Sequence, residues 1–300
     1  MGEIFRGIIP PVPTIFNENG YFDPNGMGRL IDFLISSGVH GLFFLGTGGE
    51  FSQMSSQQRK DIAEFAVEYV GKRVPVLIGT GGTSTREVVE LSEHSEKIGA
   101  DGVVVINPYY WPLSHENLIN HYKAVAESIS LPIILYNFPQ LTGQDLPPDF
   151  VLELVSQYTN IVGIKETTDS AGHIREMILK VKANFPYFSV FAGYDDHLLN
   201  TLSLGGDGAI SAGGNFAPHL IIGIYNAFKE KDFVRAIELH KQLAYLPMLY
   251  KIDSPFVTVV KEAIRLVGVE ISTYSLPPAR SLHQKEIEHI KEILKRVSLI

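Results

Sequence analysis

Short apolar runs alternate with longer amphipathic segments along most of this chain, and no other feature constrains its fold as strongly. Eight runs rich in Val, Ile and Leu have the length of strands buried on both faces: residues 7–14, 41–45, 74–78, 102–106, 132–136, 161–165, 188–192 and 208–211. Helical segments are predicted after them, at about residues 26–37, 56–70, 85–98, 116–128, 148–158, 171–184, 197–204 and 218–229. Such a succession predicts parallel strands joined by crossover helices.

A short glycine-containing sequence recurs where a predicted helix ends and the next strand begins. It starts at Gly38, Gly99 and Gly205, and each of these glycines suits the position just after a helix C-terminus. Their separations of 61 and 106 residues correspond to two and four βα units. We therefore predict an α/β fold, a (β/α)8 TIM barrel over residues 1–229, in preference to a doubly wound open sheet.

The last part of the chain has no strand pattern. Residues 233–250, 255–267 and 284–297 are predicted as three helices, and Pro277 and Pro278 interrupt the chain before the last of them. We predict a C-terminal helical extension over residues 230–300 that acts as a lid, a support or an oligomer contact.

Composition excludes several classes of function. The chain has no cysteine, so disulfides, thiolate nucleophiles and cysteine-based metal sites are impossible, and its ten histidines lack the spacing of metal ligands. A formal net charge of −8 without a basic cluster argues against nucleic acid or an anionic membrane as a partner. The apolar runs are too short to span a membrane, and the N-terminal sequence lacks the apolar core of a signal peptide. We expect a cytoplasmic protein without a metal.

One lysine stands out as a candidate nucleophile. Reactive groups of a barrel lie at the carboxyl ends of its strands, and of the 15 lysines only Lys165 ends an apolar strand. Gly163 is expected to leave room beneath its side chain. Burial lowers the pKa of an amine, and a neutral amine can attack a keto carbon to form a Schiff base. The alternative is a structural salt bridge between Lys165 and Glu166.

Neighbouring strand ends offer partners for this lysine. Tyr136 ends the preceding strand, where a phenol can carry protons, although a core tyrosine is the alternative. The turn GTGGE at residues 46–50 exposes N–H groups that can hold a carboxylate, unless its glycines serve the backbone alone. An aromatic loop at residues 107–112 fits packing or an interface. The loop with Asp195 and Asp196 offers carboxylates to sugar hydroxyls, or caps the next helix.

These motifs together resemble the family of dihydrodipicolinate synthases and N-acetylneuraminate lyases. GTGGE (46–50) is similar to the family's G-[ST]-[ST]-G-E, YNFP (136–139) to its Y-N-x-P, and GIKE (163–166) to its G-x-K-[DE]. The order and spacing match, and the resemblance covers essentially the whole chain. It implies a class I, Schiff-base enzyme that acts on pyruvate, with a covalent imine on Lys165 and no other cofactor.

The same resemblance implies further roles. Tyr136 would be the acid/base, and Thr47 would link it to Tyr110, which in this family enters the active site of a neighbouring subunit. Family members are typically tetramers, dimers of dimers, so a homo-oligomer is expected. The pyruvyl carboxylate would bind the 47–49 turn, that is Thr47, Gly48 and Gly49, and the main chain of Ile210 would border the site.

Two departures from the family pattern bear on the substrate. Gly48 replaces the second hydroxyl of the turn motif, and Leu141 stands where the synthases carry an arginine that holds aspartate semialdehyde. A leucine cannot make that contact, and its loss costs about 10²–10³ in selectivity. The strings YNFPQLTGQDL (136–146) and GYDDHLLNTL (193–202) resemble bacterial 2-keto-3-deoxygluconate aldolases instead.

We therefore expect a carbon–carbon lyase that reversibly cleaves a 2-keto-3-deoxy sugar acid to pyruvate and a short hydroxyaldehyde. Thr167, Asp195, Asp196 and Gln140 would meet the distal half of the substrate, and Gly193 is expected to be a further substrate-binding residue. One alternative is 4-hydroxy-tetrahydrodipicolinate synthase, which condenses pyruvate with aspartate semialdehyde. The other is a non-enzymatic protein that binds keto acids. In each case the partner is a small molecule.

Overall fold

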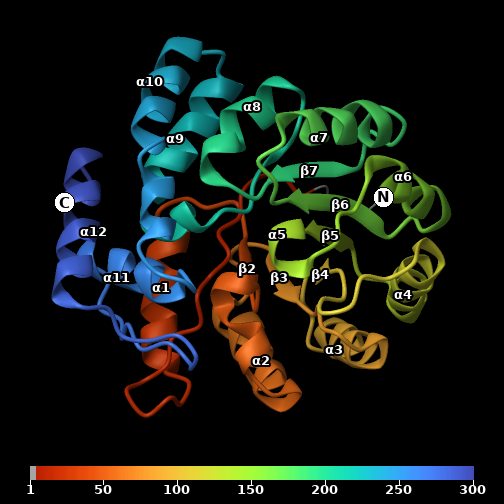
Figure 1. Cartoon of the computed structure of the whole chain (residues 1–300), viewed down its shortest axis with the longest axis horizontal. Helices are drawn as coiled ribbons and strands as arrows, with labels where there is room; N and C mark the ends of the chain where they lie inside the picture. The colour runs from red at the N-terminus through yellow and green to blue at the C-terminus, as the bar shows by residue number, and fades with distance from the viewer. Residues whose placement is uncertain (1–4) are drawn as a thin grey trace.

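Eight parallel strands form a single sheet in the computed structural model, which describes residues 5–300 (Figure 1). The strands are β1 (Gly7–Ile8), β2 (Leu42–Phe44), β3 (Val76–Gly79), β4 (Gly102–Ile106), β5 (Ile133–Asn137), β6 (Ile161–Glu166), β7 (Ser189–Ala192) and β8 (Gly208–Ala209). Their order in the sheet is β1-β8-β7-β6-β5-β4-β3-β2. Residues 1–4 lie outside the described residues. They belong to the N-terminal sequence that we expect not to be a signal peptide, so that expectation stays a prediction.

The sheet closes on itself between β1 and β2. Val12 N–H donates to the Phe43 carbonyl at 2.7 Å, and Phe43 N–H donates to the Pro10 carbonyl at 3.0 Å. The fold is therefore the predicted TIM barrel. β1 is shorter than the predicted run of residues 7–14 because Pro10, Pro11 and Pro13 have no N–H for a regular ladder.

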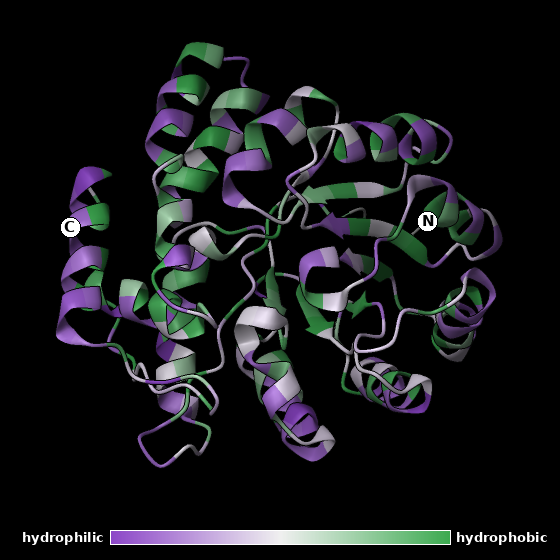
Figure 2. Cartoon of the chain, in the orientation of Figure 1, coloured by the Kyte–Doolittle hydropathy of each residue, from purple (hydrophilic) through white to green (hydrophobic). Residues whose placement is uncertain are grey.

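Helices surround the barrel, with their apolar sides toward the strands (Figures 1 and 2). They are α1 (Pro24–Ser36), α2 (Ser56–Val70), α3 (Thr85–Lys97), α4 (His115–Ser128), α6 (Pro148–Gln157), α7 (Ala171–Glu176), α8 (Leu198–Ser203) and α9 (Pro218–Lys229). The predicted helix-ending glycines have left-handed backbones, with φ of +84° at Gly38, +84° at Gly99 and +100° at Gly205. The recurring glycine sequence therefore marks equivalent points of three βα units.

Within the barrel, two segments depart from the predicted helices. A one-turn helix, α5 (Pro139–Thr142), follows β5 at a place where no helix is predicted. The predicted helix over residues 171–184 changes after α7 to a π-helical segment, Met177–Lys182. Both lie in the loops and outer layer, so the barrel is unaffected.

The C-terminal extension contains α10 (Phe233–Leu243), a 3₁₀ segment (Leu246–Lys251), α11 (Val257–Leu266) and α12 (Gln284–Arg296). The prediction of one helix over residues 233–250 was too long, because Pro247 has no N–H to continue the α-helical ladder. α11 and α12 pack against each other on the side of the molecule where α1 also lies (Figure 1), and Arg29 Nε of α1 donates to the Glu270 carbonyl at 2.6 Å. The division of the chain into domains at residue 229 stays a prediction. Among residues 5–300, no helix is both long and apolar enough to cross a membrane.

Candidate active site

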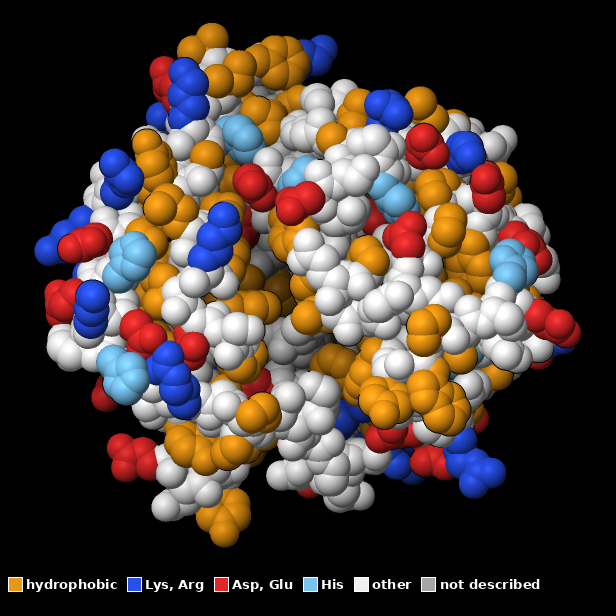
Figure 3. Space-filling model, in the orientation of Figure 1, with side chains coloured by type: hydrophobic (Ala, Val, Ile, Leu, Met, Phe, Trp, Pro, Cys, Tyr) orange, Lys and Arg blue, Asp and Glu red, His pale blue; other side chains and the backbone are white. Residues whose placement is uncertain are grey.

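A cavity of ≈ 260 Å³ lies at the carboxyl ends of the strands. The space-filling view shows the hollow near the middle of this face, with hydrophobic side chains deep inside it (Figure 3). The cavity is lined by eight residues singled out from the sequence: Thr47, Gly48, Tyr136, Gln140, Lys165, Thr167, Gly193 and Asp195. The structure therefore brings most of the predicted site together.

Lys165 reaches this cavity from the end of β6. Its side chain is 4% exposed, and Nζ lies 4.0 Å from the centroid of the Tyr136 ring and 5.5 Å from that of Phe43. Within residues 5–300, no carboxylate forms an ion pair with this amine. Burial lowers the pKa of Lys165 to about 7, although the charge of Asp195 opposes the shift. A substantial fraction of the amine is thus neutral near neutral pH.

The alternative salt bridge to Glu166 does not form. Strand alternation turns Glu166 to the opposite face, where Oε2 accepts a hydrogen bond from Asn137 at 3.0 Å and lies 3.4 Å from His173 Nδ1. The expectation about Gly163 needs correction. A Cβ at Gly163 would meet the Ser189 carbonyl oxygen at 2.8 Å, so the missing side chain makes room for the neighbouring strand and not for Lys165.

Tyr136 is the neighbour of Lys165 in the β5–β6 register. Its hydroxyl lies 3.1 Å from Thr47 Oγ1, which gives the phenol a hydroxyl partner for proton exchange. Burial raises the pKa of Tyr136 to about 12, and the hydrogen bond to Thr47 opposes part of that rise. The phenol therefore keeps its proton at rest, and its phenolate is a strong base once formed.

The turn after β2 presents two free donors. Gly49 N–H donates to the Gly46 carbonyl at 2.9 Å, and Gly49 does not line the cavity. Within the described chain, the N–H groups of Thr47 and Gly48 have no hydrogen-bond acceptor. A Cβ at Gly48 would meet nothing closer than the Pro11 carbonyl oxygen at 3.7 Å. The turn can therefore accept a carboxylate on two N–H groups and one hydroxyl.

The other end of the cavity is polar. The buried Thr167 hydroxyl has no hydrogen-bond partner within residues 5–300, and a Cβ at Gly193 would lie 2.0 Å from it, so only glycine fits there. Both oxygens of the buried Asp195 carboxylate are engaged: Gly213 N–H donates to Oδ1 at 3.0 Å, and the Tyr250 hydroxyl donates to Oδ2. Burial raises the pKa of Asp195, and these donors oppose the rise.

Three other predicted site residues lie outside the cavity. Asp196 is half-buried and does not line it. Ile210 is fully buried, and its N–H donates to the Ala192 carbonyl at 2.9 Å, so the role of its main chain at the site stays a prediction. Tyr110 is 86% exposed and stands apart from its own chain's cavity, beside the exposed Trp111. Its φ of +84° is rare for a residue with a side chain.

A model of the dihydrodipicolinate synthetase family matches residues 4–297. The chain belongs to this family. It is 54% identical over 296 residues to the Escherichia coli (strain K12) protein named "Putative 2-dehydro-3-deoxy-D-gluconate aldolase YagE", covering 99% of this chain and 98% of that protein. It is 53% identical over 290 residues to "Probable 2-dehydro-3-deoxy-D-pentonate aldolase YjhH" of the same strain, covering 97% and 96%. The crystal structure of YagE in complex with pyruvate matches with a TM-score of 0.98 at 53% identity, covering 99% and 100%.

The chain is thus a dihydrodipicolinate synthetase-family lyase, and part of its site escaped sequence analysis. Tyr250 and Phe256, from the C-terminal extension, line the cavity. Phe138 and Tyr194, from loops of the barrel, also line it. The Tyr194 hydroxyl donates to Gln140 Oε1 at 3.0 Å. Tyr194 directly precedes Asp195, a predicted site residue, so its position in the sequence could have indicated that it lines the cavity. Nothing in the sequence near Tyr250 marks it, because its approach depends on how the extension folds back on the barrel.

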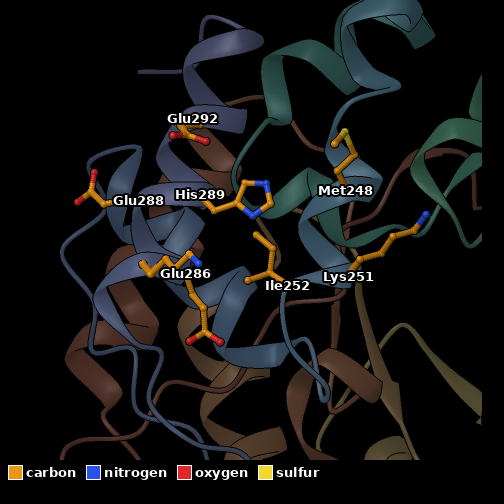
Figure 4. A pocket seen from close by; sticks show the side chains of 8 residues that line it. Met248, Lys251, Ile252, Glu286, Glu288, His289 and Glu292 are labelled. Carbon is orange, nitrogen blue, oxygen red and sulfur yellow. The ribbon is translucent and has the colours of Figure 1, made fainter.

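A larger depression elsewhere lacks the features of a reactive site. It measures ≈ 790 Å³ and lies between the 3₁₀ segment and α12, lined by residues that include Lys251, Glu288 and His289. Figure 4 shows Lys251 and Glu288 pointing away from each other, and the carboxylates of Glu286 and Glu292 do not converge with them. Among residues 5–300, no group of three His, Asp or Glu side chains is arranged to hold a metal ion.

Proposed function

We propose that this lyase is a class I aldolase that reversibly cleaves a 2-keto-3-deoxy sugar acid, such as 2-keto-3-deoxygluconate, to pyruvate and a short hydroxyaldehyde. The observation that carries the proposal is a buried Lys165 amine that has no ion-pair partner within residues 5–300 and lies beside the Tyr136–Thr47 hydroxyl pair. A neutral amine forms an imine with a keto carbon, and the imine then withdraws the electrons of the bond that breaks. No further cofactor is needed for this chemistry.

The first half of the reaction forms the imine. The substrate carboxylate binds the N–H groups of Thr47 and Gly48, which places its C2 carbonyl near Lys165. Neutral Lys165 attacks C2, and the resulting carbinolamine loses water. Tyr136 supplies the proton that leaves with this hydroxyl, so the products are a cationic iminium and a tyrosine phenolate. Charge and protons balance, because the iminium carries the charge opposite to that of the phenolate.

The second half breaks the carbon–carbon bond. The Tyr136 phenolate takes the C4 hydroxyl proton, the C3–C4 electron pair moves toward the iminium, and the hydroxyaldehyde departs. The remaining pyruvate enamine takes a proton from Tyr136 at C3, and water hydrolyses the resulting iminium. Tyr136 recovers the proton released in this hydrolysis, and pyruvate and the free Lys165 amine are formed. The high pKa of Tyr136 suits this alternation between acid and base, because the phenolate is basic enough to accept an alcohol proton.

The charges of the cavity favour a polyhydroxy substrate over aspartate semialdehyde. Leu141 lines the cavity where a synthase would carry its arginine, and among the described lining residues Lys165 is the one cation. The carboxylate of Asp195 faces the same space; it would repel a second substrate carboxylate, but it accepts hydrogen bonds from hydroxyls. Thr167, Gly193 and Gln140 complete this distal half. The names of YagE and YjhH, both of which specify 2-dehydro-3-deoxy sugar acids, agree with this choice.

We further propose that the working form is a homo-oligomer, a tetramer built as a dimer of dimers, in which Tyr110 enters a neighbouring subunit's site. The exposed Tyr110 side chain and its left-handed backbone support this role. A rare backbone conformation costs about 1–3 kcal/mol, and such strain typically persists at functional positions. In the neighbouring subunit, the Tyr110 hydroxyl would join the Thr47–Tyr136 pair.

The direct test measures pyruvate release from 2-keto-3-deoxygluconate, coupled to lactate dehydrogenase. We expect the wild type and Lys97→Ala, a change at an exposed lysine of α3, to release pyruvate, and Lys165→Ala to release none. Turnover with aspartate semialdehyde instead would establish the synthase alternative. Saturable binding of sugar acids without turnover would establish the non-enzymatic alternative.

A further inference from the structure

The Lys165 amine shares its cavity with a carboxylate but is not paired with it. Asp195 is buried and lines the same ≈ 260 Å³ cavity. Opposite charges that share a water-poor site attract each other strongly, and a buried carboxylate normally pairs with the nearest cation. An Asp195–Lys165 pair would hold the amine protonated and unreactive. We therefore expect other hydrogen-bond donors to hold the Asp195 carboxylate away from the Lys165 amine.

The C-terminal extension supplies the group that does this. Tyr250, in the 3₁₀ segment Leu246–Lys251, donates its hydroxyl hydrogen to Asp195 Oδ2, while Gly213 N–H occupies Oδ1. The Tyr250 ring packs edge-on against Phe256 with a centroid distance of 5.5 Å, and the buried Leu246 and Leu249 anchor the segment. The phenol is thus held by packing contacts within the extension.

We infer that Tyr250 is a positioning residue that holds the Asp195 carboxylate away from Lys165, so that the amine stays free to attack the keto acid. The inference rests on the proposed function, because it concerns the availability of the same amine. It also gives the extension a definite role, since the barrel alone supplies Lys165 and Asp195 and the extension keeps them apart. Tyr250 acts through Asp195, and its role concerns imine formation and not the later bond cleavage.

Few titratable groups other than Asp195 face the Lys165 amine. The titratable groups that face Lys165 are Tyr136 from β5, Tyr194 and Asp195 from the loop after β7, and Tyr250. Glu166, on the same strand, faces the other side of the sheet. Among the described residues that line the cavity, Asp195 is the one carboxylate, and its charge already acts on the Lys165 amine.

The test follows imine formation with pyruvate, trapped by cyanoborohydride and located at Lys165 by mass spectrometry, as a function of pH. Removing the phenol hydroxyl in Tyr250→Phe keeps the ring contact with Phe256 but releases Asp195 toward the amine. We expect the midpoint of the pH profile to rise by about one unit, since an opposite charge within reach of an ionised group shifts its pKa by about 1–3 units. Trapping at pH 7 should slow by up to roughly tenfold.

Control variants separate this effect from a loss of packing. Tyr245→Phe alters a tyrosine of the same extension whose ring lies under Arg296 and not at the cavity, and it should leave the profile unchanged. In an Asp195→Asn background, Tyr250→Phe should cause no further rise, because no carboxylate remains to be released. Tyr250→Met, a second side chain without a hydroxyl, provides the same comparison if Tyr250→Phe does not fold.

The outcomes separate a failure of the inference about Tyr250 from a failure of the proposed function. Wild type that traps pyruvate, with the midpoint of Tyr250→Phe or Tyr250→Met unchanged or lowered, would overturn the inference and leave the proposed function standing. Wild type that traps no pyruvate at Lys165 would overturn the proposed function itself. A rise in the midpoint that persists in the Asp195→Asn background would also overturn the inference, because Tyr250 would then act by another route.

Discussion

Two lysines are buried among residues 5–300, and they differ in their partners. Lys261, in α11, is 0% exposed and forms an ion pair with Glu50 at 2.5 Å, and its Nζ also donates to the Tyr274 carbonyl at 2.7 Å. Lys165 is 4% exposed and faces the aromatic rings of Tyr136 and Phe43, with no ion-pair partner in the described chain. Burial lowers the pKa of both amines. At Lys261 the paired Glu50 carboxylate opposes this shift directly, whereas Lys165 has no paired carboxylate in the described chain.

The contrast shows how one molecule uses a buried amine in two ways. A buried, paired ammonium fixes structure, because breaking the pair leaves an uncompensated charge. A buried amine without a partner loses its proton easily and becomes a nucleophile. The two sites are also connected: Glu50 ends the turn that carries Thr47 and Gly48, so the Lys261 pair anchors the loop that faces Lys165. The same substitution at each lysine should therefore have different consequences.

The largest difference is expected in turnover. Lys165→Met removes the nucleophile, and kcat for pyruvate release should fall by at least about 10⁴-fold. Lys261→Met should stay within about tenfold of wild type, assayed at a temperature where it is folded, because Lys261 does not touch the substrate cavity. Equal losses in the two variants would remove the distinction between a reactive and a structural lysine.

Stability should separate the two lysines next. Lys261→Met leaves the buried Glu50 carboxylate without its cation, and the free energy of unfolding at pH 7 should fall by about 3–5 kcal/mol. Urea unfolding followed by circular dichroism measures this change. Adding Glu50→Gln should recover part of the lost free energy of unfolding, because the buried glutamine amide is uncharged and needs no cation. No recovery would indicate that packing and not charge accounts for the effect.

The opposite sign is expected for Lys165→Met. Because burial lowers the pKa of Lys165 from 10.5 to about 7, the folded protein binds this proton less tightly than the unfolded chain does. The resulting stability cost is full below pH 7 and is relieved as pH rises from about 7 toward 10.5. The variant should be more stable than wild type by about 2–4 kcal/mol at pH 6, with a smaller gain at pH 9. A loss of stability at pH 6 would contradict the assignment of Lys165 as an unpaired buried amine.

The smallest expected effect concerns the turn between the two lysines. Gly48→Ser adds a hydroxyl donor where the nearest atom to a new Cβ is 3.7 Å away, so the side chain fits without strain. We expect the KM for the keto acid to fall by about two- to fivefold with kcat nearly unchanged, because the added bond acts on the carboxylate and not on the reacting carbons. Steady-state kinetics with Gly48→Ala as the matched control would show this. A rise in KM with Ser but not with Ala would mean that the carboxylate does not bind at this turn.

Sequence analysis identified Lys165 because a simple rule applies to it: a polar residue that ends an apolar strand of a barrel faces the site. Tyr136, which ends the preceding strand, follows from the same rule, whereas the role of Thr47 was implied only by the resemblance to the family. Lys261 could not be recognised, since it stands in an amphipathic helix like many surface lysines, and its burial depends on Glu50, which lies 211 residues away. Local pattern carries no information about such a pairing.

The same distinction applies to Asp195 and Tyr250. The loop position of Asp195 placed it at the mouth of the barrel, but its hydrogen bond to Tyr250 joins residues that are 55 positions apart. The fold itself was largely predictable, because eight repeats of one pattern reinforce each other. Where the prediction failed, as for the single helix over residues 233–250, one proline outweighed an otherwise helical pattern.

Of the two buried lysines, only Lys165 is expected to react with a keto acid. The most direct test incubates the wild type with pyruvate and borohydride and maps the modified lysine by peptide mass spectrometry. We expect one reduced pyruvate adduct per chain, on the peptide that contains Lys165, and an unmodified Lys261. An adduct on Lys261 or on surface lysines alone, with Lys165 unmodified, would contradict this expectation.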